Sequence, residues 1–169
     1  MPRFRMVRTS AFAAHIVCLA LFAGCKSSTG PSSSTYSATF SANGSTVQYT
    51  TQSSLLAAFA QASTQYDCIV SAFDASSSLS LQMYDGSAIT AKAYSGYNVV
   101  GGALVGVLVV YQDAAGVVYR SGGVTTDALI TVTQITSTTI RGTFQGTVKS
   151  AGHANVVIAN GTFYVKRAN

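Results

Sequence analysis

The chain contains no glutamate and no tryptophan, and all five of its acidic residues are aspartate. Helix surfaces are usually built from Glu, Lys and Arg, yet charged residues make up only 9% of this sequence. Ser, Thr, Gly, Val and Tyr are abundant instead, and Val, Thr and Tyr favour strands. The composition therefore favours a β protein over a helical one.

A strongly basic surface is also missing, although the formal net charge is +5. Three of the ten Lys and Arg residues are Arg3, Arg5 and Arg8, which leaves seven basic residues against five aspartates in the rest of the chain. No run of cations alternates with aromatic residues, and Lys166-Arg167 is an isolated basic pair. We therefore expect no nucleic-acid partner.

Residues that carry chemistry are scarce. After residue 24 the one histidine is His153, in the expected turn KSAGHAN, and no G-x-S-x-G sequence occurs. The aspartates are too scattered to indicate a metal site. A two-carboxylate glycan hydrolase would have to use aspartates alone, for example Asp85 with Asp113. We expect a non-enzymatic protein without metal or cofactor, and keep an Asp-dependent glycan hydrolase as a distant alternative.

The N-terminus has the pattern of a secretory signal. Arg3, Arg5 and Arg8 precede an apolar run, AFAAHIVCLALFAG, at residues 11–24. A spanning helix needs roughly 20 apolar residues, whereas a basic start, a short apolar run and small residues at its end are typical of a signal peptide. The sequence predicts a signal peptide over residues 1–24.

The end of this run, LFAGC, resembles a bacterial lipobox, with Phe22 where Leu is usual. The resemblance implies cleavage between Gly24 and Cys25, and a lipid on the Cys25 sulfur that anchors the protein to a membrane. Lys26, rather than Asp, follows the cysteine, which looks like sorting to the outer membrane in a host with two membranes. The alternative is an ordinary signal peptide with an incidental cysteine.

Ser, Thr, Gly and Pro dominate residues 26–35, KSSTGPSSST, and such sequences form flexible coil. We therefore divide the chain into a signal peptide (1–24), a lipidated cysteine with its tether (25–35) and one β domain (36–169). With Cys18 in the signal and Cys25 acylated, Cys68 has no partner within the chain. We expect it to be a small buried apolar residue.

Alternating runs bounded by turn residues predict most of the β domain. Asn43-Gly44 between two such runs is typical of a type I′ hairpin turn. Residues 78–83 place their apolar side chains on one face, and so do residues 140–149, where Gly142 and Gly146 flank Phe144 and indicate a bend or bulge. We predict an all-β, antiparallel sandwich or barrel-like domain of about 8–10 short strands.

Two segments leave alternatives. Residues 53–63, SSLLAAFAQAS, contain the one candidate for a short helix, near residues 53–62, because Leu55, Leu56 and Phe59 could share a face; a strand remains possible. Residues 99–111, VVGGALVGVLVVY, contain a G-x-x-x-G spacing but are too short to span a membrane. They fit a central strand, or a strand preceded by a Gly-Gly turn.

Several of these runs carry a family resemblance: VVYQDAAGVVYRSGG, ALITVTQI, TIRGTFQGTV and VVIANGTFYVK. Over residues 79–165 the chain resembles a family of small bacterial lipoproteins of unknown function, common in Bacteroidota-like genomes. The resemblance implies an antiparallel β domain facing the cell envelope. It carries over no catalytic residues.

These observations predict a lipid-anchored protein of the cell envelope, most simply of the outer membrane, that is a binding or structural module. It could face outward and capture a glycan or mediate adhesion, or face the periplasm as an accessory subunit of an envelope complex. Four tyrosines could stack on glycans or simply pack within sheets: Tyr94, Tyr97, Tyr111 and Tyr119. An outer patch of tyrosines would favour a glycan, and an exposed flat apolar strand face would favour a protein partner.

Overall fold

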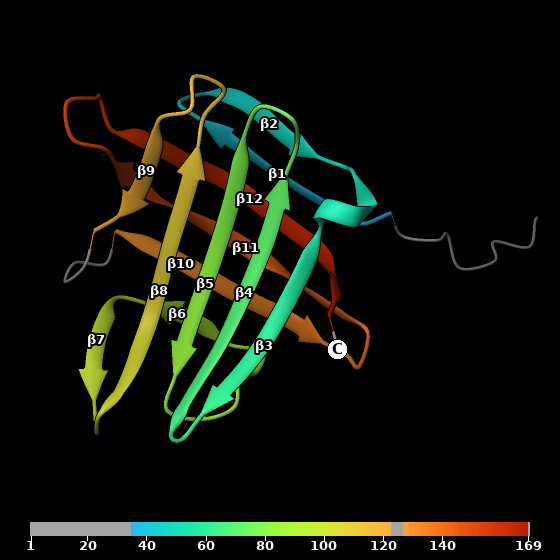
Figure 1. Cartoon of the computed structure of the whole chain (residues 1–169), viewed down its shortest axis with the longest axis vertical. Coiled ribbons are helices and arrows are strands. Elements are labelled where there is room, and N and C mark those ends of the chain that lie inside the picture. Colours follow the sequence, from blue (N-terminus) through green and yellow to red (C-terminus); the bar gives the residue numbers. More distant parts are fainter. Residues whose placement is uncertain (1–34, 123–126, 169) are drawn as a thin grey trace, which may run out of the picture. The chain divides into compact units, whose positions relative to one another are not determined.

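Strands make up most of the described chain, which comprises residues 35–122 and 127–168 of a computed structural model (Figure 1). The expected signal peptide, Gly24, Cys25 and the tether up to residue 34 lie outside these residues. A 3₁₀ turn, η1, covers Gln52–Ser54. The strands are β1 (Ser37–Ala42), β2 (Ser45–Tyr49), β3 (Leu56–Ala62), β4 (Gln65–Phe73), β5 (Ser78–Asp85), β6 (Ala93–Ser95), β7 (Tyr97–Val100), β8 (Ala103–Gln112), β9 (Val118–Ser121), β10 (Ala128–Ile135), β11 (Thr139–Lys149) and β12 (Val156–Arg167).

The strands form two layers that are joined at both edges. In Figure 1, β3, β4, β5 and β8 lie in front, and β1, β10, β11 and β12 cross behind them. Pairing runs from β12 through β3, β4, β5, β8 and β9 to β11, which pairs with β12 again and so closes a ring. The prediction of an all-β, sandwich-like or barrel-like domain is confirmed, with twelve strands in the described ranges rather than eight to ten.

One pairing departs from the predicted antiparallel pattern. β12 and β3 run parallel where the two layers meet, with Lys166 opposite Leu56 and Arg167 opposite Ala57. The chain reaches β3 from the rear-layer hairpin β1–β2 through η1. β3 therefore enters the front layer beside the end of β12 and runs in the same direction as β12, rather than pairing antiparallel with it.

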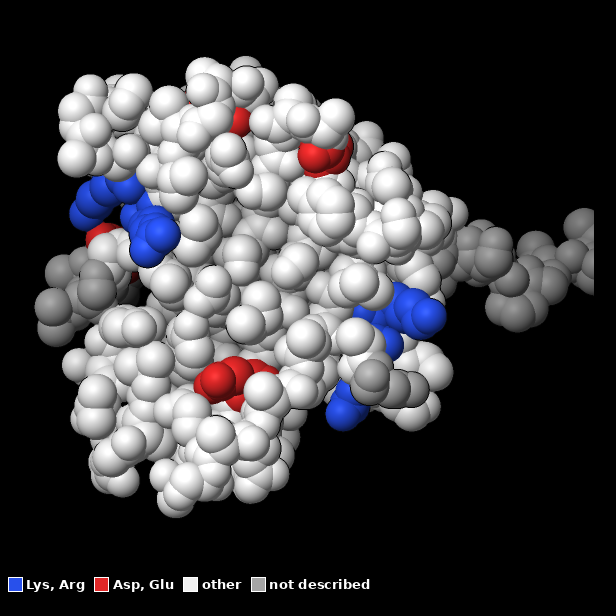
Figure 2. Space-filling view, viewed as in Figure 1, with Lys and Arg blue, Asp and Glu red and all other residues white. Residues whose placement is uncertain are grey.

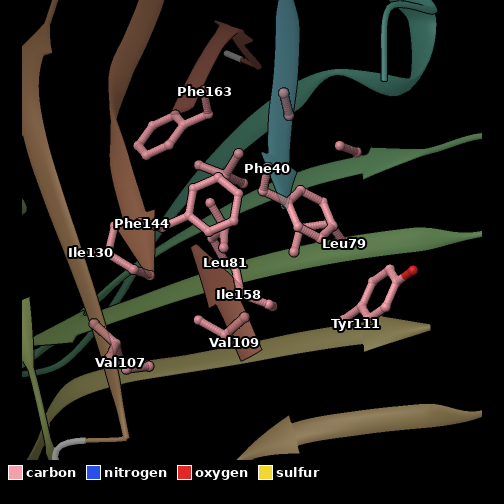
Figure 3. Close-up of a cluster of buried hydrophobic side chains, with 14 of the residues drawn as sticks. Phe40, Leu79, Leu81, Val107, Val109, Tyr111, Ile130, Phe144, Ile158 and Phe163 are labelled. Carbon is pink, nitrogen blue, oxygen red and sulfur yellow. The ribbon is translucent and has the colours of Figure 1, made fainter. Parts of the chain in front are cut away.

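The core fills the space between the layers. Leu79, Leu81 and Met83 of β5 point inward and are buried, as their alternation predicts. Figure 3 shows Leu79 and Leu81 in one cluster with Phe40 and Phe144 of the rear layer. The Phe40 ring of β1 meets the Tyr111 ring of β8 edge-on, with centroids 5.4 Å apart. This edge-to-face contact joins the two layers at the centre of the core.

Two glycines of the rear layer make room for two phenylalanine rings. Gly142 of β11 lies opposite Phe163 of β12, and Phe144 of β11 lies opposite Gly161 of β12. A Cβ on Gly142 would come 2.7 Å from Cζ of Phe163, and a Cβ on Gly161 would come 2.7 Å from Cγ of Phe144. The register shifts just beyond Phe144, so the bulge that the glycine spacing predicts is confirmed.

Two hairpins follow from local turn chemistry. Asn43 and Gly44 have φ values of 48° and 87°, which confirms the predicted type I′ turn between β1 and β2. Gly101 and Gly102 also have positive φ and connect β7 to β8, so residues 99–111 form a hairpin whose long strand follows a Gly-Gly turn. Along the two described ranges, no helix is long and apolar enough to cross a membrane.

The helix considered near residues 53–62 is wrong. After η1 the chain enters β3, which pairs with β4 along its whole length. Leu55 and Ala57 are fully buried and Phe59 is half-buried, so the inward side chains follow a period of two. The alanines of LAAFAQA obscure this period, since Ala is accepted on either face and also favours helices. Pairing with β4 overrides that local preference.

Candidate functional site

Hydroxyl groups line the outer face of the rear layer. Successive residues of a strand point to opposite faces, so the neighbours of the buried Ile130, Phe144 and Phe163 point away from the core. Four threonines lie directly opposite one another across four strands: Thr131 of β10, Thr143 of β11, Thr162 of β12 and Thr39 of β1. The adjacent row contains Arg141, Tyr164 and Ser37.

Two adjoining hollows occupy this face. The larger has a volume of about 620 Å³, and Arg141, Thr143, Thr162 and Tyr164 are among its lining residues. The smaller, about 300 Å³, shares Thr143 and Thr162 and extends to Asn160. We call the two hollows together the threonine groove. Both volumes are within the range of small-molecule sites, about 300–1,000 Å³.

Interruptions of the strand register explain why this face is hollowed. The register shifts between Val132 and Gln134 where β10 pairs with β11, and again beyond Phe144 where β11 pairs with β12. A third shift lies between Thr39 and Ser41 of β1. Bulges bend a strand and increase its twist, so the outer face curves inward between these positions.

The groove carries positive charge. Arg141 lines the larger hollow, and Lys166 lies on the same face because it is two residues beyond Tyr164. No aspartate lines either hollow. Within the described ranges the ion pairs are Lys92 with Asp85 and Lys149 with Asp127, so Arg141 and Lys166 have no acidic partner there.

Several hydroxyls in the groove are free to bind a ligand. Across the described part of the chain, the side chains of Thr143, Thr162 and Ser37 make no hydrogen bond, and Thr143 and Thr162 are exposed. The rim is more tightly organised, because the Thr136 hydroxyl accepts the backbone N–H of Thr139 at 2.9 Å. Open hydroxyls beside a fixed rim can donate and accept hydrogen bonds to polar ligands.

An aromatic pair borders the groove. The ring of Tyr164 lines it, and the Tyr36 ring lies 5.3 Å away between centroids. Gln52 of η1 holds Tyr36 in place: its side-chain amide donates to the Tyr36 carbonyl at 3.0 Å and accepts the Tyr36 N–H at 3.1 Å. The 3₁₀ turn therefore positions Tyr36, and Tyr36 supports the ring that faces the groove.

The aspartates that a hydrolase could use do not come together. Asp85 is the last residue of β5, at the end that pairs with Gly106, whereas Asp113 follows the end of β8 that pairs with Ser78. The two lie at opposite ends of this ladder, separated by more than about 20 Å at ~3.3 Å per residue. Paired carboxylates of glycosidases are roughly 5–9.5 Å apart. Asp85 and Asp113 therefore do not form such a pair.

Asp74 and Asp113 accept backbone N–H groups in turns. Asp74 accepts the N–H groups of Ser76 at 2.8 Å and Ser77 at 2.7 Å, which lower the pKa of its carboxyl. Asp113 accepts the N–H groups of Ala115 and Val117 in the β8–β9 turn. Asp67 is different because it lies within β4.

The other residues considered for chemistry have structural surroundings. His153 is exposed in the β11–β12 turn, and its ring is 6.2 Å from that of Tyr119. Cys68 is fully buried, as predicted, and burial raises the pKa of its thiol to about 12. In residues 35–122 and 127–168, no three His, Cys or Asp side chains are grouped so that they could hold a metal ion. Three of the four singled-out tyrosines are buried packing residues, Tyr94, Tyr111 and Tyr119, and Tyr97 is half-buried.

A second surface of interest is the outer face of the front layer. Figure 2 shows few charged side chains on this side, with basic residues at both sides and an acidic patch inside its lower half. Leu56, Ile69 and Phe73 are 36%, 37% and 51% exposed on this side. Between them and β8, the Tyr84 hydroxyl donates to Gln82, and Gln82 donates to Ser80, so the polar groups of β5 are partly occupied by one another. This face is more apolar than the threonine groove, because it exposes apolar side chains and has few free polar groups.

Comparison with protein-family models, curated proteins and solved structures gives no match to this chain. Alternation over residues 140–149 predicts that Arg141 and Thr143 lie on the face opposite to Phe144, but it does not predict the groove. The signal was present in the outward threonines of TVT, RGT and GTFY, but only the pairing order brings them together.

Proposed function

We propose that this protein is a lipid-anchored envelope protein, not an enzyme, whose β domain captures glycans in the threonine groove. The observation that supports this most is the combination of free hydroxyls, Arg141 and the ring of Tyr164 in one hollow. Sugars offer hydroxyls that donate and accept hydrogen bonds, and threonine hydroxyls do both. Aromatic rings at binding surfaces add apolar contact area.

The proposed anchor is Cys25, at the end of the signal-like segment. Stable anchoring takes more than one acyl chain, and acylation of both the sulfur and the new amino terminus would provide this. Residues 26–35 would then tether the domain at up to about 33–36 Å from the lipid. The lipoprotein family suggested by the sequence over residues 79–165 would imply the same location.

A periplasm-facing accessory subunit is the second candidate. The exposed apolar side chains Leu56, Ile69 and Phe73, which lie on neighbouring strands of the front layer, favour it, because exposed apolar surface on one face commonly marks a protein partner. In that case the front face would dock on an envelope complex, and the groove would face away from it.

Location is tested with the C-terminally tagged full chain in cells. We expect fatty-acid labelling of the protein, its loss in Cys25→Ala and its retention in the control Cys68→Ala. Protease added to intact cells should remove the anchored species by cutting within residues 26–35. Labelling of Cys25→Ala would refute the anchor, and protection until lysis would replace outward capture by the accessory-subunit function.

Glycan capture is tested with full-length protein in neutral detergent on an array of neutral and acidic glycans. We expect binding that is lost when Thr143→Val and Thr162→Val are combined. The matched control combines Thr46→Val and Thr50→Val, which are exposed threonines outside the groove. An array without any bound glycan would overturn capture altogether.

A further inference from the structure

We infer that the threonine groove binds an acidic glycan whose sugars carry carboxylates, and that Arg141 binds the carboxylate. This inference rests on the proposed glycan capture and adds the chemical class of the glycan. It follows from the charge of the groove, the geometry of the guanidinium and the shape of the hollows.

Arg141 lies where a bound chain would meet it. It faces outward from β11, opposite Tyr164 of β12 and Gln134 of β10, and lines the larger hollow. Its strand position is held from β10 as well, because the Thr133 hydroxyl donates to the Arg141 carbonyl at 3.2 Å. A guanidinium presents a planar fork of N–H donors that matches a carboxylate with two parallel hydrogen bonds.

No acidic side chain in the groove competes with a ligand for the Arg141 guanidinium. No carboxylate lines either hollow, and Lys166 adds a second cation on the same face. Asp127 lies beyond the groove, where it is paired with Lys149 at 2.9 Å. An anionic ligand therefore meets attraction at the Arg141 end and no acidic side chain along the two hollows.

The neutral part of the groove suits the rest of a sugar chain. Beyond Arg141, the exposed hydroxyls of Thr143 and Thr162 line both hollows and lead toward Asn160. From Thr139 to Gln145 of β11, the lining extends about 20 Å at ~3.3 Å per residue. This length accepts more than one sugar ring, with one carboxylate at Arg141 and hydroxyls along the threonine row.

The test measures affinity by calorimetry with the full-length protein in neutral detergent. Three probes are used: tetragalacturonate, a neutral tetrasaccharide of galactose, and a sulfated dextran. We expect tetragalacturonate to bind more tightly than the neutral probe, and more weakly at high salt. Arg141→Gln should weaken its binding by about 10-fold or more, the cost of one charged hydrogen-bonded contact.

Two variants separate specific recognition from general attraction. Arg120→Gln removes the same charge from an exposed position of β9 outside the groove and should leave affinity unchanged. Arg141→Lys keeps the charge without the fork and should still weaken tetragalacturonate binding. Thermal unfolding of each variant checks that it folds.

Each outcome is decisive. Equal binding of acidic and neutral probes, or full affinity in Arg141→Gln, would overturn the acidic class while leaving glycan capture standing. Equal weakening by Arg120→Gln would replace recognition at Arg141 by unspecific attraction. If sulfated dextran binds more tightly than tetragalacturonate, and Arg141→Lys binds as tightly as the native protein, a carboxylate is not the group that Arg141 recognises. Binding of none of the probes, together with an empty array, would overturn the proposed function as well.

Discussion

At the scale of single residues, Asp85 shows how the few charges of this protein are used. It is nearly buried at the end of β5, forms an ion pair with Lys92, and accepts the N–H of Ser87 at 3.2 Å. Burial by itself raises the pKa of this carboxyl, but the hydrogen bond and charge of Lys92, together with Ser87, outweigh burial and lower it. The ionised form of Asp85 therefore stabilises the folded state.

We expect Asp85→Asn to destabilise the protein at pH 7 and to be nearly neutral in acid. A carboxyl whose pKa is lower in the folded state contributes stability above its unfolded pKa, about 3.9, and loses this contribution as the pH falls through the folded value. The free energy of unfolding at pH 7 should fall by about 1–3 kcal/mol. Urea unfolding of both proteins from pH 7 down to about pH 2 measures the difference.

The double variant with Lys92→Met serves as the control for this effect. Once Lys92 is absent, Asp85→Asn should cost much less, because the two residues act as a pair. A difference between the native protein and the Asp85→Asn variant that stays constant down to about pH 2 would show that the carboxylate charge is not responsible.

At the scale of elements, β11 and β12 are joined by the two Gly–Phe pairs as well as by their backbone hydrogen bonds. Each ring lies over the glycine opposite, so across that pair it packs against the backbone of the neighbouring strand. Phe144 also contacts Phe40 of β1, with ring centroids 5.6 Å apart. The glycines thus allow three rear-layer strands to share one aromatic cluster.

We expect Gly142→Ala and Gly161→Ala each to lower the free energy of unfolding by about 1–3 kcal/mol or more, because an added methyl overfills the core. A Cβ at Gly142 would also meet the Thr131 carbonyl at 2.2 Å, so the ring alone cannot relieve the clash by moving. Gly86→Ala is the matched control, since its Cβ would lie an ordinary 3.5 Å from the Ala103 Cβ. Thermal unfolding that ranks all three variants alike would contradict this account.

The same strands show what sequence alone could predict. The Asn43-Gly44 hairpin and the inward faces of β5 and β11 were predictable, because a type I′ turn and a period of two are properties of neighbouring residues. β3 was not, since LAAFAQA carries no clear period of its own and becomes a strand through its pairing with β4. Its parallel contact with β12 depends on residues more than a hundred positions away.

The threonine groove, too, could be predicted only in part from the sequence. The outward position of Arg141 could be predicted from alternation within β11, but its place in the row depends on pairing: Tyr164 lies opposite it on β12, and Ser37 of β1, far away in the sequence, lies opposite Tyr164. The hollow also requires bulges in three pairings, and of these only the one near Phe144 left a signal, in its glycines. The site therefore depends on pairing order and curvature rather than on a motif.

At the scale of the whole molecule, the ring of strands depends on two narrow seams. At one, β9 joins the layers, pairing with β8 and, through Arg120 and Ser121, with β11. At the other, the end of β12 meets β3. There Lys166 N–H donates to the Leu55 carbonyl at 3.3 Å, and Ala168 N–H donates to the Ala57 carbonyl at 2.8 Å. The Arg167 guanidinium also lies 4.3 Å from the ring centroid of Phe59.

We expect a chain that ends after Val165 to lose about 3 kcal/mol of unfolding free energy, from a few backbone hydrogen bonds and one cation–π contact. The control, Lys166→Ala with Arg167→Ala, keeps the backbone pairing and should lose less than half of this. Amide hydrogen exchange should speed up in β3 of the truncated chain and stay slow in β5, whose two neighbours remain in place. Equal losses of unfolding free energy in both variants would show that side chains, rather than backbone pairing, stabilise this seam. Amide exchange that speeds up equally in β3 and β5 would mean that the layers unfold as one unit rather than opening at this edge.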